Sequence, residues 1–283
     1  PDGCPASHQA SKTPCDGELV QHVADALASR LAGHTSSDAD VRRYQSLVGA
    51  LLYIDAAVNT RTDVAYPVGM LCRAMSCPTP ELYDDALRVL YYLHRHREIG
   101  LTHEADQSPL AGYTDSDWAV KHSTPGWLFT YSRAVVTWGS KKQQSIALFS
   151  CEAEIMAMSE ACKDSLYLDT FLGELDLKVE GDAPPVLYGD NRGANDLAYN
   201  PEHHQRTKHI DRRHFWVREL VENMRISVAY VNTVDNLADF LTKPLPSKTF
   251  FAMRDKIMNV PLCSRLGALL KCSSLRSRGG VAM

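Results

Sequence analysis

The order in which strand-like and helix-like runs alternate is the feature that most constrains what this chain can fold into. After Gly100, runs with the composition of short strands alternate with runs of helical periodicity. The order is three strands, a helix, a strand, two helices, a strand and a last helix. A mixed order of this kind predicts an α/β fold, in which helices cover both faces of a sheet. The expected strands lie at 110–114, 126–131, 134–138, 186–189 and 226–231, and the expected helices at 151–175, 191–199, 211–223 and 235–244.

A smaller helical part precedes the sheet region. Residues 1–40 are rich in Ser, Ala, Asp, Gly and His and predict a mostly flexible linker, in which 17–31 could form a short helix. Three apolar runs with helical spacing follow. The last residues carry basic side chains without acids, which is typical of a flexible tail. The expected organisation is a linker at 1–40, a helical segment at 41–105, an α/β domain at 106–260 and a basic tail at 261–283.

Composition describes an ordinary globular protein. The net charge is −4 over 283 residues, so no global basic field is present to hold a polyanion. The eight cysteines form no CxxC pair, which favours reduced thiols inside a cell. The longest apolar run, 47–54, is less than half of the roughly 20 residues that a bilayer crossing needs, so we expect a soluble chain without a membrane partner. A first residue other than Met suggests a piece of a longer polyprotein.

Acidic residues stand where predicted strands end and predicted helices begin. Ligands of open α/β sheets bind at the carboxyl ends of the strands, so these acids can meet in one cleft. Gathered carboxylates repel one another unless they are protonated or hold cations, and oxygen ligands of this kind suit Mg²⁺ or Mn²⁺. Each acid taken alone could equally be a turn former or a helix cap. The candidates are Asp115 after the first strand, Asp190 after the fourth, Glu152 or Glu154 in the long helix, and Asp235 or Asp239 in the last helix.

Two such cations about 3.5–4 Å apart would stabilise the attacking and leaving oxygens of an in-line phosphoryl displacement. The joint pattern of acids therefore predicts phosphodiester cleavage. The motif Tyr83-Asp84-Asp85 superficially suggests a polymerase. It lies in a helical run and has no residue between the Tyr and the two acids, so no polymerase activity is expected of this chain.

Several motifs resemble, in order and spacing, the ribonuclease H region of copia-type retrotransposon polyproteins. Two upstream motifs resemble the segment that joins reverse transcriptase to ribonuclease H in the same polyproteins. The resemblance covers roughly 41–260. The ribonuclease H motifs are YTDSDW at 113–118, SKKQ at 140–143, CEAEIMA at 151–157, YGDN at 188–191, TKHID at 207–211 and NLADFLTKPL at 236–245, and the upstream ones are YQSLVGALLY at 44–53 and TRTDVAY at 60–66.

The resemblance implies a ribonuclease H-like fold with a mixed five-stranded sheet, and it selects among the paired acids. Matched motif by motif, it implies a catalytic and metal-binding set of Asp115, Glu154, Asp190 and Asp239, with two Mg²⁺ ions and Mn²⁺ as a substitute. It implies that Asp115 bridges the ions, that Glu154 and Asp190 hold the ion near the leaving group, and that Asp239 helps to hold the ion near the attacking water. Asp235 is then expected to cap the last helix.

The implied function is metal-dependent endonucleolytic hydrolysis of the RNA strand of RNA–DNA hybrids within a reverse transcriptase polyprotein. The implied partners are the hybrid and the polymerase domain of the same polyprotein, in an intracellular, cytoplasmic retroelement particle. One alternative is a catalytically inactive remnant that binds only nucleic acid or a partner protein. Another is a different nuclease of the same fold, because a fold does not determine a substrate.

Two groups of basic residues are candidates for contacts with nucleic-acid phosphates, which position a duplex without reading its sequence. Each could instead be a solvated face. The histidines at 203, 204, 209 and 214 have no nearby cysteine, and their spacing matches no common zinc module. The basic candidates are Lys141 and Lys142 after the hairpin, and Arg206, Lys208, His209 and Arg212 around the start of the helix at 211–223.

The chain departs from the family pattern at three places. The turn at Ser132 and Arg133 lacks the usual glycines, Phe149 and Cys151 stand where small hydroxylated residues are usual, and Asn195 with Asp196 makes the helix after Asp190 unusually polar. None of these departures removes a candidate carboxylate.

Overall fold

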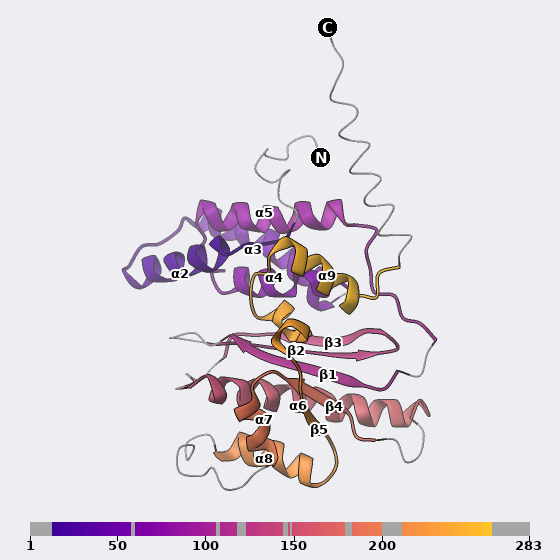
Figure 1. Ribbon diagram of the computed structural model, residues 1–283. Coiled ribbons are helices and arrows are strands. Elements are labelled where there is room, and N and C mark those ends of the chain that lie inside the picture. The colour runs from indigo at the N-terminus through magenta and orange to yellow at the C-terminus, as the bar shows by residue number, and fades with distance from the viewer. Residues whose placement is uncertain are drawn as a thin grey trace. The chain divides into compact units, whose positions relative to one another are not determined.

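The computed structural model describes residues 13–57, 60–105, 108–117, 123–143, 147, 149–178, 183–199 and 211–261. Contacts divide the chain into two compact units. We call the unit formed by Ala105–Leu245 the sheet unit, and the unit formed by Pro1–Glu104 and Pro246–Met283 the helical unit (Figure 1). Among the described residues, no helix combines the length and the apolar character that a membrane crossing requires.

The sheet unit contains one mixed sheet of five strands in the order β3-β2-β1-β4-β5. The first three strands pair antiparallel as a meander, and β1 pairs parallel with β4, which pairs parallel with β5. This arrangement confirms the predicted fold class. The strands are β1 (Ala111–Asp117), β2 (Thr124–Tyr131), β3 (Ala134–Ser140), β4 (Val186–Gly189) and β5 (Ser227–Tyr230).

The α-helices described in the sheet unit lie on one face of this sheet (Figure 1). These helices pack against that face through a core that includes Phe129, Ile155 and Leu187. On β2, Gly126 and Trp127 point to opposite faces because side chains alternate along a strand. Trp127 belongs to that core, while the space next to Gly126 is filled by the segment 238–242. The helical elements are α6 (Ser150–Glu174), α7 (Arg192–Tyr199), α8 (Asp211–Glu222) and the 3₁₀ turns η4 (Thr233–Asp235) and η5 (Leu237–Leu241).

The hairpin between β2 and β3 is as predicted, and its turn forms without the glycines that are usual in the family. Ser132 and Arg133 both have positive φ, at 50° and 67°. Two consecutive left-handed residues form the type of turn that matches the right-handed twist of the flanking strands, and Asn-Gly is its preferred sequence. The turn therefore keeps its geometry with residues that are less suited to it.

The prediction of an α-helix at 235–244 is wrong, because the structure has two short 3₁₀ turns here, η4 and η5. Asparagine side chains cap both turns, Asn232 for η4 and Asn236 for η5, and each accepts a backbone N–H two residues ahead. These local bonds compete with continuous α-helix formation. The expected capping role of Asp235 is also wrong, because Asn236 is the cap of η5 and Asp235 is exposed.

The helical unit includes one helix that the sequence analysis gave only as possible and one that it did not predict. The segment 17–31, expected within the linker, forms a helix whose Leu19, Val23 and Ala26 are buried. A helix after Pro246 was not expected, and it groups with the helical unit although the predicted boundary lies at 260. The helical unit contains α2 (Glu18–Leu31), α3 (Asp38–Leu52), a π-helical turn η1 (Tyr53–Ala57), η2 (Thr62–Val64), α4 (Ala65–Cys72), α5 (Pro80–Arg95) and α9 (Ser247–Ile257).

The upstream motif at 60–66 forms a buried ionic junction in the helical unit. Arg61 donates from Nε and Nη2 to the two carboxylate oxygens of Asp63, at 2.9 and 2.8 Å. The hydroxyl of Tyr92 in α5 donates to Asp63 Oδ2 at 2.5 Å, and Arg254 in α9 donates to that hydroxyl at 3.5 Å. Burial together with the Arg254 charge lowers the pKa of His96 to about 4. The junction therefore links α5 and α9 through buried hydrogen bonds of the Tyr92 hydroxyl.

Candidate functional site

Three of the predicted acids meet at one edge of the sheet. Asp115 lies in β1, and Asp190 directly follows β4. The parallel register pairs Thr114 with Gly189, so the next residue of each strand is an aspartate at the same edge. Glu154, near the start of α6, completes the group. One carboxylate oxygen from each of Asp115, Glu154 and Asp190 lies within 4.8 Å of the others.

The surroundings of this cluster favour a bound cation. Asp115 and Glu154 are 5 % and 8 % exposed, so their charges are poorly solvated. Burial, together with the charges of Asp115 and Asp190, raises the pKa of Glu154 to about 9. A backbone hydrogen bond from Ser116 opposes this shift. A divalent cation would relieve the repulsion, and clustered carboxylate oxygens are the ligands that Mg²⁺ and Mn²⁺ prefer. The residues present therefore fit such an ion.

Asp239, the fourth predicted acid, is held beside the cluster by η5. It is buried and faces Asp115, and it forms an ion pair with Lys243, whose Nζ lies 2.8 Å from Asp239 Oδ1. Burial raises the pKa of Asp239 to about 7; the hydrogen bond from Lys243 opposes the rise and the Asp115 charge adds to it. Asp239 is not one of the three acids within 4.8 Å.

Three residues that the sequence reasoning did not single out hold η5 against the sheet. Asn236 is fully buried, and its Nδ2 donates to the Thr114 carbonyl of β1 at 3.0 Å. Thr242 Oγ1 donates to Asp115 Oδ2 at 2.5 Å. Gly126, which pairs with Asp115 across the strands, has no Cβ to block Thr242. Asn236 and Thr242 belong to the motif at 236–245, which was the signal available in the sequence.

The polar residues of α7 have a structural role at the same edge. Asn195 is buried, and its Nδ2 donates to the carbonyl of Gly189 at 2.9 Å and of Ala229 at 3.5 Å. Asn191 Oδ1 accepts the backbone N–H of Ala194 at 3.1 Å and so caps α7. The family departure at Asn195 thus ties the ends of β4 and β5 together next to Asp190.

The rival acids lie elsewhere. Asp117 is at the exposed end of β1, and Asp235 is exposed in η4. Glu152 is buried in α6 but outside the cluster.

The predicted basic residues are only partly described. Lys141 and Lys142 are exposed after β3, and Lys141 Nζ lies 5.5 Å from the ring centroid of Trp127. Arg206, Lys208 and His209 lie outside the described residues, as does the side chain of Arg212 in α8.

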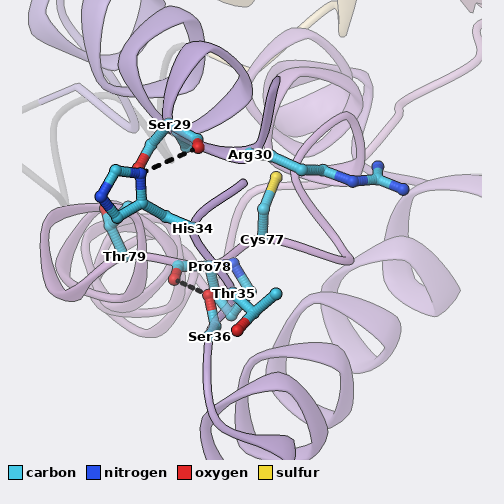
Figure 2. Close-up of a pocket in the computed structure, with 9 residues that line it drawn as sticks. Ser29, Arg30, His34, Thr35, Ser36, Cys77, Pro78 and Thr79 are labelled. Atoms are coloured by element: carbon cyan, nitrogen blue, oxygen red, sulfur yellow. Dashed lines mark hydrogen bonds between the residues drawn. The ribbon is translucent and has the colours of Figure 1, made fainter. Parts of the chain in front are cut away.

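A hollow in the helical unit offers no comparable chemistry. Figure 2 shows this pocket of about 160 Å³, between the end of α2 and the start of α5. Two hydrogen bonds join residues of its lining: His34 Nδ1 lies 3.3 Å from the Ser29 carbonyl, and Ser36 Oγ donates to the Pro78 carbonyl at 2.8 Å (Figure 2). No acid lines it among the described residues. The carboxylate edge of the sheet is therefore the candidate site.

The strand order, the strand directions and the acids at the edge of β1 and β4 define a ribonuclease H-like domain preceded by a helical segment. No family model matches the chain. The Pol polyprotein of transposon TNT 1-94 from Nicotiana tabacum is 38 % identical over 211 residues, which cover 73 % of this chain and 16 % of that polyprotein. The Pol polyprotein of transposon RE1 from Arabidopsis thaliana is 34 % identical over 229 residues, 78 % of this chain and 15 % of that polyprotein.

The chain belongs to the retrovirus-related Pol polyproteins of copia-type transposons. It spans less than one fifth of the length of these two relatives. A further relative, secreted RxLR effector protein 161 from Plasmopara viticola, is 42 % identical over 130 residues, which cover 44 % of this chain and 90 % of that protein.

Solved ribonuclease H structures align with about half of the chain. The N-terminal RNase H domain of rv2228c from Mycobacterium tuberculosis has a TM-score of 0.36 at 12 % identity and covers 51 % of this chain and 94 % of that one. LC11-RNase H1, solved in complex with an RNA/DNA hybrid, has a TM-score of 0.36 at 13 % identity, with 47 % and 94 % covered. At these TM-scores the superpositions add nothing to the fold described above.

Proposed function

We propose that the sheet unit hydrolyses the RNA strand of RNA–DNA hybrids with divalent cations, as the ribonuclease H part of a copia-type polyprotein. The observation that carries this proposal is the cluster of Asp115, Glu154 and Asp190 within 4.8 Å on a ribonuclease H-like sheet. Membership of the Pol family supports it. The polymerase domain of the same polyprotein and an intracellular retroelement particle are the proposed partner and setting.

The acids of the site would hold Mg²⁺ or Mn²⁺: Asp115, Glu154 and Asp190 one ion, and Asp239 with Asp115 a second. Bound there, the ions supply positive charge beside the attacking and leaving oxygens of a phosphodiester. Asp115 is kept in place by the hydroxyl of Thr242, and Glu154 by the backbone N–H of Ser116. Such preorganised ligands cost no rearrangement during the reaction.

Protonation of the site is set by Glu154 and Asp239. Their raised pKa values mean that each carboxyl retains a proton to a higher pH than an exposed acid does. A ligand must be in the carboxylate form, so Glu154 and Asp239 would each give a proton to solvent in order to hold a cation.

Substrate binding is assigned to the basic residues that the sequence predicts for it. Lys141 and Lys142 are exposed, and we assign them contacts with phosphates. We assign the same role to Arg206, Lys208, His209 and Arg212. These contacts position a duplex but do not identify RNA. The 2′-hydroxyl is the group that distinguishes an RNA strand from DNA, so selection of the RNA strand requires contacts with it.

The test is cleavage of an end-labelled RNA–DNA hybrid by the full chain, compared with duplex RNA and duplex DNA, in Mg²⁺ and in EDTA. The variant Asp115→Asn should lose cleavage, while Asp117→Asn, which removes an exposed acid two residues away, should retain it. Circular dichroism of both variants shows whether the fold is kept. Equal cleavage by wild type and Asp115→Asn would refute the assignment, and equal cleavage of all three substrates would indicate a general nuclease.

A second candidate is a non-catalytic module that only binds nucleic acid or a partner protein. The similarity to secreted RxLR effector protein 161, of which this chain covers 90 %, favours this candidate, because that relative is named an effector and not a polyprotein. Hybrid binding in an electrophoretic mobility assay without any cleavage in Mg²⁺ or Mn²⁺ would support this candidate over the first.

A further inference from the structure

The carboxylate site contains a cation of its own, the side chain of Lys243. Its Nζ lies 2.8 Å from Asp239 Oδ1 and 4.0 Å from Asp115 Oδ2. Asp239 and Lys243 are four residues apart, and the chain between them is the end of η5 and Thr242. The lysine is therefore part of the same short segment that brings Asp239 to the sheet.

This lysine lies closer to Asp239 than to Asp115. Asp115, Glu154 and Asp190 lie within 4.8 Å of one another and can share one cation. Asp239 lies outside that group and forms an ion pair with the Lys243 ammonium. A second cation at Asp239 would stand next to the positive charge of Lys243, and like charges at such distances repel.

The side chain of Lys243 is able to leave. It is 38 % exposed, so its ammonium can move into water without crossing the core. Other groups hold the segment in place: Asn236 is bonded to β1, and Thr242 to Asp115. Removing the ion pair therefore does not remove the anchors of η5.

We propose that Lys243 is a tethered competitor of the second divalent cation. This inference rests on the proposed function, because it requires a cation site at these acids. One ion binds to Asp115, Glu154 and Asp190 while the Lys243 ammonium keeps its 2.8 Å contact with Asp239, and another binds at Asp239 only when the ammonium moves away. A phosphate at the site offers the ammonium another anion, so phosphate and the second cation should bind cooperatively.

The test is calorimetric titration of the metal-free full chain with Mn²⁺. The variant Lys243→Gln keeps the length of the side chain and removes its charge. The control is Lys163→Gln, which makes the same change of net charge in the same unit. Lys163 lies nine residues beyond Glu154 in α6, about 13 Å along the helix axis, which is beyond the Debye length of about 8 Å at physiological salt.

We expect wild type to bind one Mn²⁺ tightly and a second weakly. Lys243→Gln should bind the second ion at least about tenfold more tightly, or about 1.4 kcal/mol. Lys163→Gln and Lys243→Arg should behave as wild type. Inorganic phosphate should strengthen the second event in wild type and have less effect in Lys243→Gln.

Different failures have different meanings. If wild type binds Mn²⁺ and Lys243→Gln binds it with the same or lower affinity, the competitor role is refuted and the metal site stands. If neither protein binds Mn²⁺, the proposed metal site is refuted and the competitor role with it. Should Lys243→Gln unfold without metal, the Mn²⁺ concentration that refolds it gives the same comparison, since binding to the folded state stabilises it.

Discussion

Replacing Gly126 with alanine should disturb both the stability of the sheet unit and its metal site. An added Cβ would lie 2.6 Å from Thr242 Cγ2 and 3.0 Å from Leu241 Cβ, whereas ordinary contacts begin at 3.4 Å. The segment that follows η5 must therefore move away from β2 by nearly 1 Å. Overpacking of this kind costs about 1–3 kcal/mol. The same movement stretches the 2.5 Å hydrogen bond from Thr242 to Asp115 and shifts Asp239.

Tryptophan fluorescence measures this effect in the sheet unit alone. The chain has four tryptophans, at 118, 127, 138 and 216, and all of them belong to that unit. A loss of about 1–3 kcal/mol corresponds to a fall in melting temperature of roughly 3–10 °C for a unit of this size. The stabilisation by added Mg²⁺ should also decrease, because the acids no longer meet in the same geometry.

Gly173→Ala is the matched control. Gly173 lies in α6, and an added Cβ would meet no heavy atom within 4 Å. Alanine is favoured over glycine in a helix by up to about 1 kcal/mol, so this variant should be slightly more stable than wild type. The reasoning is refuted if Gly126→Ala melts at the wild-type temperature and binds Mg²⁺ with wild-type affinity.

Three further predictions concern protonation, the ionic junction and a helix start. Because the pKa values of Glu154 and Asp239 are raised to about 9 and about 7, the folded state holds more protons than the unfolded state above about pH 4.5. The melting temperature in EDTA should therefore fall between pH 5 and pH 9, with a smaller fall in Glu154→Gln, and Mg²⁺ affinity should rise over the same range; a flat profile in EDTA contradicts this. Asp63→Asn leaves Arg61 buried without its counter-charge and should destabilise the helical unit by about 3–5 kcal/mol, seen in far-ultraviolet circular dichroism but not in tryptophan fluorescence; coincident loss of both signals would contradict that. Phe149→Ser should stabilise the sheet unit by about 1 kcal/mol in a urea titration, because the N-cap of α6 has no side-chain hydrogen bond in the present sequence, and no gain would count against the capping argument.

Much of the sheet unit follows from local sequence. The strands, the hairpin and the long helix α6 depend on periodicity and on turn residues within a few positions, so the sequence alone predicted them. The element at 235–244 could not, because Asn236 offers its side chain to the backbone two residues ahead and replaces α-helical hydrogen bonds. The packing of α2 and α9 also escaped prediction, since their buried residues find partners far away along the chain.

The acids of the site show the same division. Their places at strand ends and in the long helix predicted a cluster, and the structure brings Asp115, Glu154 and Asp190 together. Periodicity did not separate Asp115 from Asp117, because residues two apart on a strand share a face. Burial and the position of η5 separate them, and the motifs of the family had selected the same residue.

The sequence by itself determined the succession of strands and helices along the chain, the family and the candidate acids, because these properties reside in local patterns and in the spacing of motifs. Tertiary structure alone decided which groups control those acids. Thr242 reaches Asp115 across 127 residues, and Asn236 reaches Thr114 across 122. Gly126 leaves the space that Thr242 occupies, and Lys243 lies on the same segment and pairs with Asp239. Such contacts depend on distances in space, which no local pattern of residues encodes.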